Sequence, residues 1–404
     1  MATVADPTQY NGLFKIVYAD KIKDLIPDGV KVLKMIDFVP KAEMQGESYR
    51  QAVSLNLEHG FTYSNSGSAT NLNGAIAGAT KFAEVRSTEM ILQSTVSLAA
   101  VSRSQNPQAA FVQATKHVVK NMMLSMSKRL EVQMLYGQVG IGKVASASGS
   151  TLVITAAEFA PGIWNCAENM KIETRTSAGA LHDSLQVLSI DIETRTITTV
   201  APIATTVATD VIHYGGAYGQ EFAGLHKIIT NTSTLFGLDA AQYNLWRGNQ
   251  YVLPTAGPLS FDAIKSSISL AVNKGLEGKV TALVSTRAWD DLMSDLAALR
   301  RYDSSYDSSE AVYGSESIKF HSQNGEVEVV PSIHVKEGYA YIFSKDDFKR
   351  VGSSDMTFEQ PGIGGNYIIP LENAMGYGLR LYSDQALFCE APGRTALISN
   401  IINA

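Results

Sequence analysis

The chain has 404 residues, of which 45% are hydrophobic and only 18% are charged, with a net charge of −6. Its length allows two or three domains with their own cores, and its low charged fraction suggests that partners cover part of the surface. The charges are spread along the sequence, which excludes an obvious nucleic-acid-binding face.

Two distant cysteines, Cys166 and Cys389, form no CxxC or Cys/His cluster, so we expect two buried, reduced thiols. The first 20 residues lack a basic region followed by an apolar one, so no secretory signal is expected. No apolar run approaches the roughly 18–20 residues of a membrane span, so no membrane partner is expected.

Residues 1–46 are expected to form an N-terminal arm and a first strand. A short helix is predicted over 13–26, ended by the turn signal Pro27-Asp28-Gly29, and a strand over 30–38, stopped by Pro40. The arm cannot close a core by itself, so it must lie on this subunit or on a neighbour.

Residues 47–101 are predicted to form one large hairpin. Apolar and polar residues alternate around Leu55 and again around Leu92, which is the period of a half-buried strand. Between the strands, residues 64–80 carry no charge and are rich in Gly, Ala, Ser and Asn. Because a two-stranded ribbon is marginal alone in water, we expect another molecule to hold it.

Residues 102–138 are expected to hold one long helix, from an Asn106-Pro107 start to a left-handed cap at Gly137. Apolar residues recur every three to four positions through Met126, Leu130 and Met134, whereas Glu131 is assigned to a wetter flank. At 1.5 Å per residue the helix is about 45 Å long, which suggests a strut.

The remainder divides into three parts. Residues 139–215 hold short Thr- and Val-rich runs at about 10-residue spacing, which predict a small β-barrel or sandwich. Residues 216–354 read as α/β, with helices that begin after the caps Ser260 and Thr286. Residues 355–404 contain a flexible connection, a long strand from 377 to 389 and an apolar end.

The strings that resemble catalytic motifs fail on their context. Residues 137–143 read GQVGIGK, like a phosphate-binding loop, but a helix is expected before them, strands after them, and Val144 replaces the required Ser or Thr. The dinucleotide-binding pattern G-x-G-x-x-G, which would begin at Gly140, is likewise incomplete, because Ala145 stands where the pattern requires Gly. The seven histidines show no zinc-ligand spacing, and Asp346-Asp347 is read as a solvated turn. We therefore expect no catalytic, cofactor-binding or metal-binding residues, and no enzyme.

The order of arm, hairpin, long helix, α/β region and long final strand resembles the major capsid proteins of tailed bacteriophages. That resemblance implies the α+β Hong Kong 97-type fold, with an N-terminal arm, an extended E-loop hairpin, a long spine helix, and peripheral and axial domains. Residues 139–215 would be an inserted all-β module, which either stands on the outer surface or braces adjacent subunits.

The resemblance further implies a virion protein, made in the host bacterial cytoplasm, that self-assembles into hexamers and pentamers. These would form an icosahedral shell around double-stranded DNA, which is enclosed without sequence-specific binding. A separate scaffolding protein, a portal and a decoration protein are expected partners. Because no Lys lies between Lys41 and Lys81, the hairpin offers no nucleophile for a covalent crosslink, and an uncrosslinked shell is expected.

Two groups of residues are predicted to make contacts between subunits. The tip of the E-loop contributes Ser64, Gly67, Asn71, Leu72, Gly74, Ile76 and Gly78. The axial loop, expected at the centre of the capsomer, contributes Arg300, Arg301, Tyr302, Asp303 and Tyr306.

Two alternatives stay open. One is a cellular nanocompartment shell of the same fold, similar to an encapsulin, which would enclose an enzyme in place of DNA. The other is a β-rich adhesive or carbohydrate-binding protein centred on residues 139–215.

Overall fold

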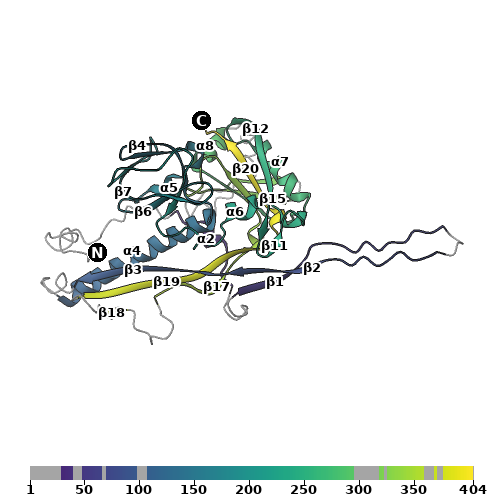
Figure 1. Cartoon of the computed structure of the whole chain (residues 1–404), viewed down its shortest axis with the longest axis horizontal. Coiled ribbons are helices and arrows are strands. Elements are labelled where there is room, and N and C mark those ends of the chain that lie inside the picture. The colour runs from purple at the N-terminus through teal and green to yellow at the C-terminus, as the bar shows by residue number, and fades with distance from the viewer. Residues whose placement is uncertain are drawn as a thin grey trace.

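Figure 1 shows the computed structural model, which describes residues 29–39, 48–65, 70–97, 107–294, 318–322, 325–358, 368–370 and 376–403. The chain is a mixed α+β protein built from a long helix, a sheet of long strands, a closed barrel and a six-stranded sheet. The long helix lies between the barrel and the sheet of long strands, and one hairpin extends well beyond everything else (Figure 1).

The long helix, α4, runs from Pro107 to Tyr136, as the sequence predicts. The cap expected at Asn106 lies outside the described residues. From Leu130 to Gly137 every residue of α4 and its end is buried, so the helix enters the core with all of its sides covered. The helix is therefore a strut only over its first part, and its last two turns are a centre of packing.

The end of α4 differs from the prediction. The left-handed conformation falls on Gln138 (φ 67°) and Gly140 (φ 99°), and not on Gly137. Gly137 is needed for space, since a Cβ there would lie 2.2 Å from the carbonyl oxygen of Phe222. This close approach comes from a segment distant in sequence, so the local pattern could not reveal it.

The strand predicted over residues 30–38 is wrong. Residues Val32–Met35 form the short helix α2, and only Phe38 makes a bridge, parallel to Arg350. The reason is Glu131 of α4, whose carboxylate accepts hydrogen bonds from the backbone N–H groups of residues 31, 32 and 33 at 3.0, 2.9 and 2.8 Å. The first backbone N–H groups of a helix have no acceptor within the helix, and the carboxylate supplies one for those at the start of α2. Glu131 is fully buried, so its assignment to the solvent-exposed side of α4 is also wrong. The helix predicted over 13–26 lies outside the described residues.

The predicted hairpin over residues 47–101 is too long. Strand β1 (Ser48–Ser54) pairs antiparallel with β2 (Thr80–Arg86), and these two strands make the hairpin. The next strand, β3 (Thr88–Ser97), pairs along its length with β19 (Gly376–Cys389). The alternation around Leu92 identified a strand, but alternation does not tell which partner a strand takes.

The sheet of long strands is completed by β17 (Phe348–Thr357) and β18 (Ile368–Pro370), which both pair with β19. Strand β19 matches the long strand predicted near the C-terminus. Because its partners come from residues 88–97 and 348–370, this sheet joins the beginning of the chain to its end.

Between residues 142 and 214 six strands close into a barrel, within the range where a small β-barrel or sandwich was expected. Its order is β4-β5-β8-β7-β6-β9. The strands are β4 (Gly142–Ser148), β5 (Thr151–Ile154), β6 (Lys171–Arg175), β7 (Leu181–Asp191), β8 (Thr196–Thr199) and β9 (Val211–Tyr214). The connection from β5 to β6 contains a 3-10 helix, Ala156–Glu158, and the helix α5, Pro161–Trp164.

The α/β part contains a six-stranded sheet in the order β12-β20-β16-β13-β15-β14. Its strands are β12 (Asn249–Gly257), β13 (Val280–Val284), β14 (Ile318–Ser322), β15 (Gly325–Pro331), β16 (Ala340–Phe343) and β20 (Ala396–Ile401). Further elements are α6 (Leu225–Thr230), α7 (Phe261–Val272), α8 (Thr286–Ser294), the strands β10 (Thr234–Leu235) and β11 (Leu238–Asp239), and 3-10 helices at Asn244–Trp246, Lys345–Asp347 and Pro392–Arg394.

The caps of the two longer helices in this part are both serines. Ser260 caps α7 as predicted, accepting from the N–H of Ala263. At α8 the cap is Ser285, whose Oγ accepts from the N–H of Ala288 at 3.2 Å, and not the predicted Thr286. The prediction missed by one residue because Ser and Thr are both good capping residues.

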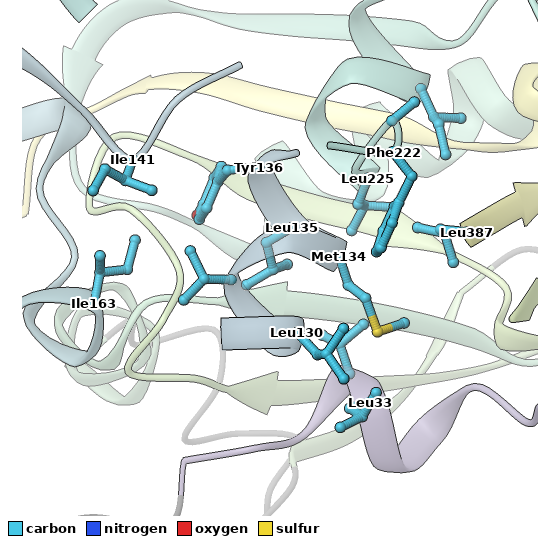
Figure 2. Close-up of a cluster of buried hydrophobic side chains, with 14 of the residues drawn as sticks. Leu33, Leu130, Met134, Leu135, Tyr136, Ile141, Ile163, Phe222, Leu225 and Leu387 are labelled. Carbon is cyan, nitrogen blue, oxygen red and sulfur yellow. The ribbon is translucent and has the colours of Figure 1, made fainter. Parts of the chain in front are cut away.

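The buried end of α4 gathers apolar side chains from all parts of the chain (Figure 2). Leu130, Met134, Leu135 and Tyr136 of α4 meet Leu33 of the arm, Ile141 and Ile163 of the barrel region, Phe222 and Leu225 near α6, and Leu387 of β19. Because so many elements contribute side chains to this cluster, it forms only when they have all come together.

One buried ion pair lies beside this cluster, where α4, the barrel and the six-stranded sheet meet. Lys336 is 1% exposed, and its Nζ donates to a carboxylate oxygen of Glu158 at 2.6 Å and to the carbonyl of Gly140 at 3.1 Å. Its backbone N–H donates to the hydroxyl of Tyr136 at 2.7 Å, and the hydroxyl of Tyr339 donates to Glu158 at 2.6 Å. Burial raises the pKa of Glu158, but Lys336 and these hydrogen bonds outweigh it, so the pKa is lowered overall.

The ion pair makes a prediction for stability. Lys336→Met should lower the free energy of unfolding by about 3–5 kcal/mol, because it leaves the buried Glu158 carboxylate without its cation. The double variant Lys336→Met/Glu158→Gln should recover much of this loss, since no unpaired charge then remains buried. Urea unfolding of the three proteins measures both effects, and a loss under about 1 kcal/mol for Lys336→Met would contradict the role given to the pair.

A histidine in the same region predicts how stability depends on pH. Burial, reinforced by Lys336 and opposed by Glu158, lowers the pKa of His226 to about 4, below its usual 6.5, and its Nδ1 lies 2.9 Å from the Tyr341 hydroxyl. The folded state therefore keeps His226 neutral, and its contribution to stability is complete above pH 6.5 and is lost as the pH falls toward 4.

Replacing His226 by Gln should flatten the slope of unfolding free energy against pH between 6.5 and 4 by up to about 1.4 kcal/mol per pH unit. Unfolding in urea at a series of pH values measures this slope.

Candidate functional site

The described residues offer little for catalysis. No group of three or more His, Cys, Asp or Glu side chains lies together in this part of the chain as a metal site requires. The string 137–143 joins the end of α4 to β4, as its context predicted, and so lacks the strand–loop–helix order of a phosphate-binding loop. Within the described residues no helix has both the length and the apolarity to cross a membrane.

Two of the simple predictions for single side chains are wrong. Cys389 is buried, but Cys166 is exposed. Asp347 is 8% exposed instead of solvated, and it accepts a hydrogen bond from Arg394 at 3.2 Å. The exposure of each of these side chains depends on which other segment of the chain covers it, and the local sequence does not contain that information.

The base of the hairpin is tied firmly to the chain. Ala83 and Val85 of β2 are buried, and the ring of Tyr49 packs edge-on against Phe388 with centroids 5.1 Å apart. The N–H of Glu84 donates to the carbonyl of Phe236 at 2.9 Å. This end of the hairpin therefore has a fixed direction relative to the core.

The part of the hairpin beyond β1 and β2, which we call the distal hairpin, carries large apolar side chains that are exposed to solvent. The exposed fractions are 75% for Leu57, 66% for Phe61, 90% for Tyr63, 87% for Leu72 and 55% for Ile76. No Asp, Glu, Lys or Arg lies between residues 59 and 80. A projecting, uncharged ribbon with this many exposed apolar groups indicates an interaction surface.

The predicted site residues fall into two groups. Ser64, Asn71, Leu72, Gly74, Ile76 and Gly78 lie exposed on the distal hairpin, whereas Gly67 lies outside the described residues. Residues 295–317, which include Arg300, Arg301, Tyr302, Asp303 and Tyr306, also lie outside them. The contacts of both groups with other subunits remain predictions.

Sequence reasoning missed Phe61 and Tyr63. They immediately precede the residues 64–80 assigned to the tip, and they look like an ordinary continuation of the first strand. The available signal was that they are aromatic and stand in an uncharged stretch that no core was expected to cover.

A second apolar surface lies on the body of the protein, where α4, β3 and the β5–β6 connection meet. A pocket of about 310 Å³ opens there, and its apolar lining includes Met90, Leu92, Leu124, Met126 and Met170. Ile91, which also lines it, is 60% exposed.

Arg129 reaches the same pocket. Its guanidinium lies 3.3 Å from the centre of the Tyr214 ring, and its Nη1 is buried without a hydrogen-bond partner among the described residues. A buried donor of this kind gains from an acceptor brought by another molecule.

Comparison with known proteins rests on structure alone, because no model of a known protein family matches the sequence and no curated protein is similar to it. The capsid asymmetric unit of cyanophage A-1(L) superposes with a TM-score of 0.55 and 11% identity, over 96% of this chain and 98% of that chain. This chain has a phage capsid fold. The arrangement extends through the whole chain and is not confined to one domain.

Two further structures are similar at lower scores. A chain of Mycobacterium phage Bobi gives a TM-score of 0.49 at 12% identity, covering 100% of both chains. The holo-SrpI encapsulin complex from Synechococcus elongatus gives 0.44 at 9% identity, covering 99% of this chain and 96% of that one.

The distal hairpin should contribute nothing to the stability of the isolated subunit. Replacing residues 57–77 by an Asn-Gly turn should leave the thermal unfolding midpoint within about 2 °C, because the large apolar side chains that the structure describes there are exposed. Ala83→Asp, at the buried base, serves as the contrast and should lower the midpoint strongly, since it buries an unpaired charge. A large fall in the truncated protein would mean that the distal hairpin folds back onto its own subunit.

Proposed function

We propose that this chain is a structural capsid subunit, which assembles with copies of itself into hexamers and pentamers of an icosahedral shell around double-stranded DNA. The observation that carries the proposal is the capsid fold over nearly the whole chain, including a hairpin that cannot cover its own apolar side chains. The protein acts in the virion, and it needs no cofactor for this role.

The physical basis is repetition of modest contacts. A hairpin that reaches outward from one subunit and packs on another makes a heterologous contact, and such contacts close into rings and shells when the rotation allows it. The packing of Tyr49 on Phe388 and the burial of Ala83 and Val85 fix the direction of the hairpin base, so every copy presents the hairpin at the same angle. The residues of the 300–306 loop are proposed to meet at the centre of each ring.

The charge of the chain agrees with a container for DNA. Attraction to phosphate grows with the Lys and Arg groups that face it, and a net charge of −6 spread along the chain avoids a strong grip on the packaged molecule. A separate scaffolding protein, a portal and a decoration protein are proposed partners. The shell is proposed to be uncrosslinked, because the distal hairpin carries no Lys.

Electron microscopy of the purified chain tests the proposal. We expect uniform polyhedral particles or ring-shaped capsomers, and a chain that stays monomeric both alone and with a scaffolding protein present would refute a shell function. Nuclease-resistant DNA in particles recovered from infected cells would distinguish a virion from a nanocompartment, whose particles would hold a protein cargo.

Deletion of residues 64–80 tests the part given to the hairpin. We expect soluble, folded subunits that no longer form particles, since the main contact with the neighbour is lost. Sedimentation and electron microscopy of the deletion variant beside the intact chain supply the measurement. Particles of normal yield and size would show that assembly does not need the hairpin.

A further inference from the structure

A tight turn contacts the hairpin where it leaves the body of the protein. Strands β10 and β11 pair with each other and are joined by a two-residue turn, Phe236-Gly237. Strand β11 lies against β2 (Figure 1). The carbonyl of Phe236 accepts a hydrogen bond from the N–H of Glu84 in β2, at 2.9 Å. The turn is therefore attached directly to the base of the hairpin.

The first residue of this turn is an unusual one for its backbone conformation. Phe236 has a φ of 52° and Gly237 a φ of 78°, so both lie in the left-handed region, as a type I′ turn requires. Asn or Asp usually precedes Gly in such a turn, and a bulky side chain is rare there because its Cβ crowds the backbone. Strained residues persist only where their surroundings hold them, and they concentrate at functional positions. The strain therefore points to a role for the Phe236 ring.

The ring of Phe236 completes a row of three aromatic rings. It is 9% exposed, and it packs on Phe388 of β19 with the ring centroids 5.3 Å apart. Phe388 in turn packs on Tyr49 of β1, with centroids 5.1 Å apart. An Asn at position 236 would suit the turn better, but it would remove the first ring of the row. The chain thus keeps the less favourable turn residue and gains a packed connection from the turn to β1.

The turn is also fixed to the α/β part of the chain. The indole N–H of Trp246, whose side chain is fully buried, donates to the carbonyl of Leu235 at 3.0 Å. Near the same 3-10 helix, the Tyr243 ring lies 5.0 Å from the ammonium of Lys81 in β2. Strand β2 continues into β3 through Ser87 alone, and a two-stranded ribbon has little stiffness of its own at such a junction. The turn supplies a second attachment, which restricts the swing of the hairpin.

We propose that Phe236 is a positioning residue, which sets the angle of the hairpin relative to the body and thereby the size of the shell. The inference rests on the proposed function, in which copies of the chain close into a shell, and it names the residue that controls the geometry of closure. Heterologous contacts close only when the rotation from one copy to the next allows it. Because the direction of a projecting element changes that rotation, a fixed angle selects one shell and a loose angle permits several.

The angle is measured first on dissociated subunits that carry two spin labels. The labels are attached to Cys166→Ser/Leu57→Cys/Gln250→Cys, in which both new positions are exposed, one just beyond β1 and one on β12. In this background Phe236→Asn should broaden the distribution of distances between the labels about twofold or more, because the ring no longer packs the base in one position. Phe236→Leu, which keeps apolar bulk, should broaden it less. The matched control Phe261→Leu alters a buried ring of α7 in the second core cluster and should leave the width within about 20%.

The size of the shell is measured by electron microscopy on the same substitutions without labels, under the conditions in which the unaltered chain assembles. The unaltered chain and Phe261→Leu should give particles of one diameter, whereas Phe236→Asn should give several diameters or open sheets. Thermal unfolding of dissociated subunits shows which variants are folded. If Phe236→Asn is not folded, Phe236→Leu decides both measurements, with changes in the same direction.

The possible failures are separable. If the unaltered chain never assembles, the proposed function fails, and the distances between the labels still show whether Phe236 sets the angle. If neither substitution of Phe236 broadens the distance distribution more than Phe261→Leu does, the positioning role is overturned. If the distribution broadens but the particles keep one unchanged diameter, control of the angle stands and control of the shell size is overturned.

Discussion

The structure depends on the burial of the last two turns of α4. Every residue from Leu130 to Gly137 is covered, and each side is covered by a different part of the chain: the arm, the barrel region, the segment near α6 and the long strand β19. Polar groups contribute beside the apolar ones, since Glu131 holds the arm and Tyr136 accepts from the backbone of Lys336. The helix end thereby fixes the relative positions of parts that the sequence separates widely.

The hairpin presents the opposite situation. Its base shares the packing of the core through Tyr49, Ala83 and Phe388, whereas the large apolar side chains described in its distal half are exposed. A rigid base and an exposed apolar end suit the proposed shell subunit, which would present the same contact in every copy. In that shell, the apolar area that the single chain leaves exposed would be buried against other copies.

Much of the fold could be predicted from local patterns. The spacing of apolar residues predicted α4, short Thr- and Val-rich runs predicted strands where the barrel lies, and alternation predicted β3. The candidate surface was located to the uncharged stretch of the hairpin, but its aromatic members Phe61 and Tyr63 were missed.

The sequence by itself determined the kind and order of elements, since helix and strand periods, caps and the absence of charge are local properties. Only the tertiary structure decided that residues 32–35 are helical, because the carboxylate that caps them belongs to Glu131 about a hundred residues later. It alone decided that β3 leaves the hairpin for β19, and that Lys336 can be buried beside Glu158. In each case the deciding partner is distant in the chain, and the free energy of such a contact is realised only when folding brings the two segments together.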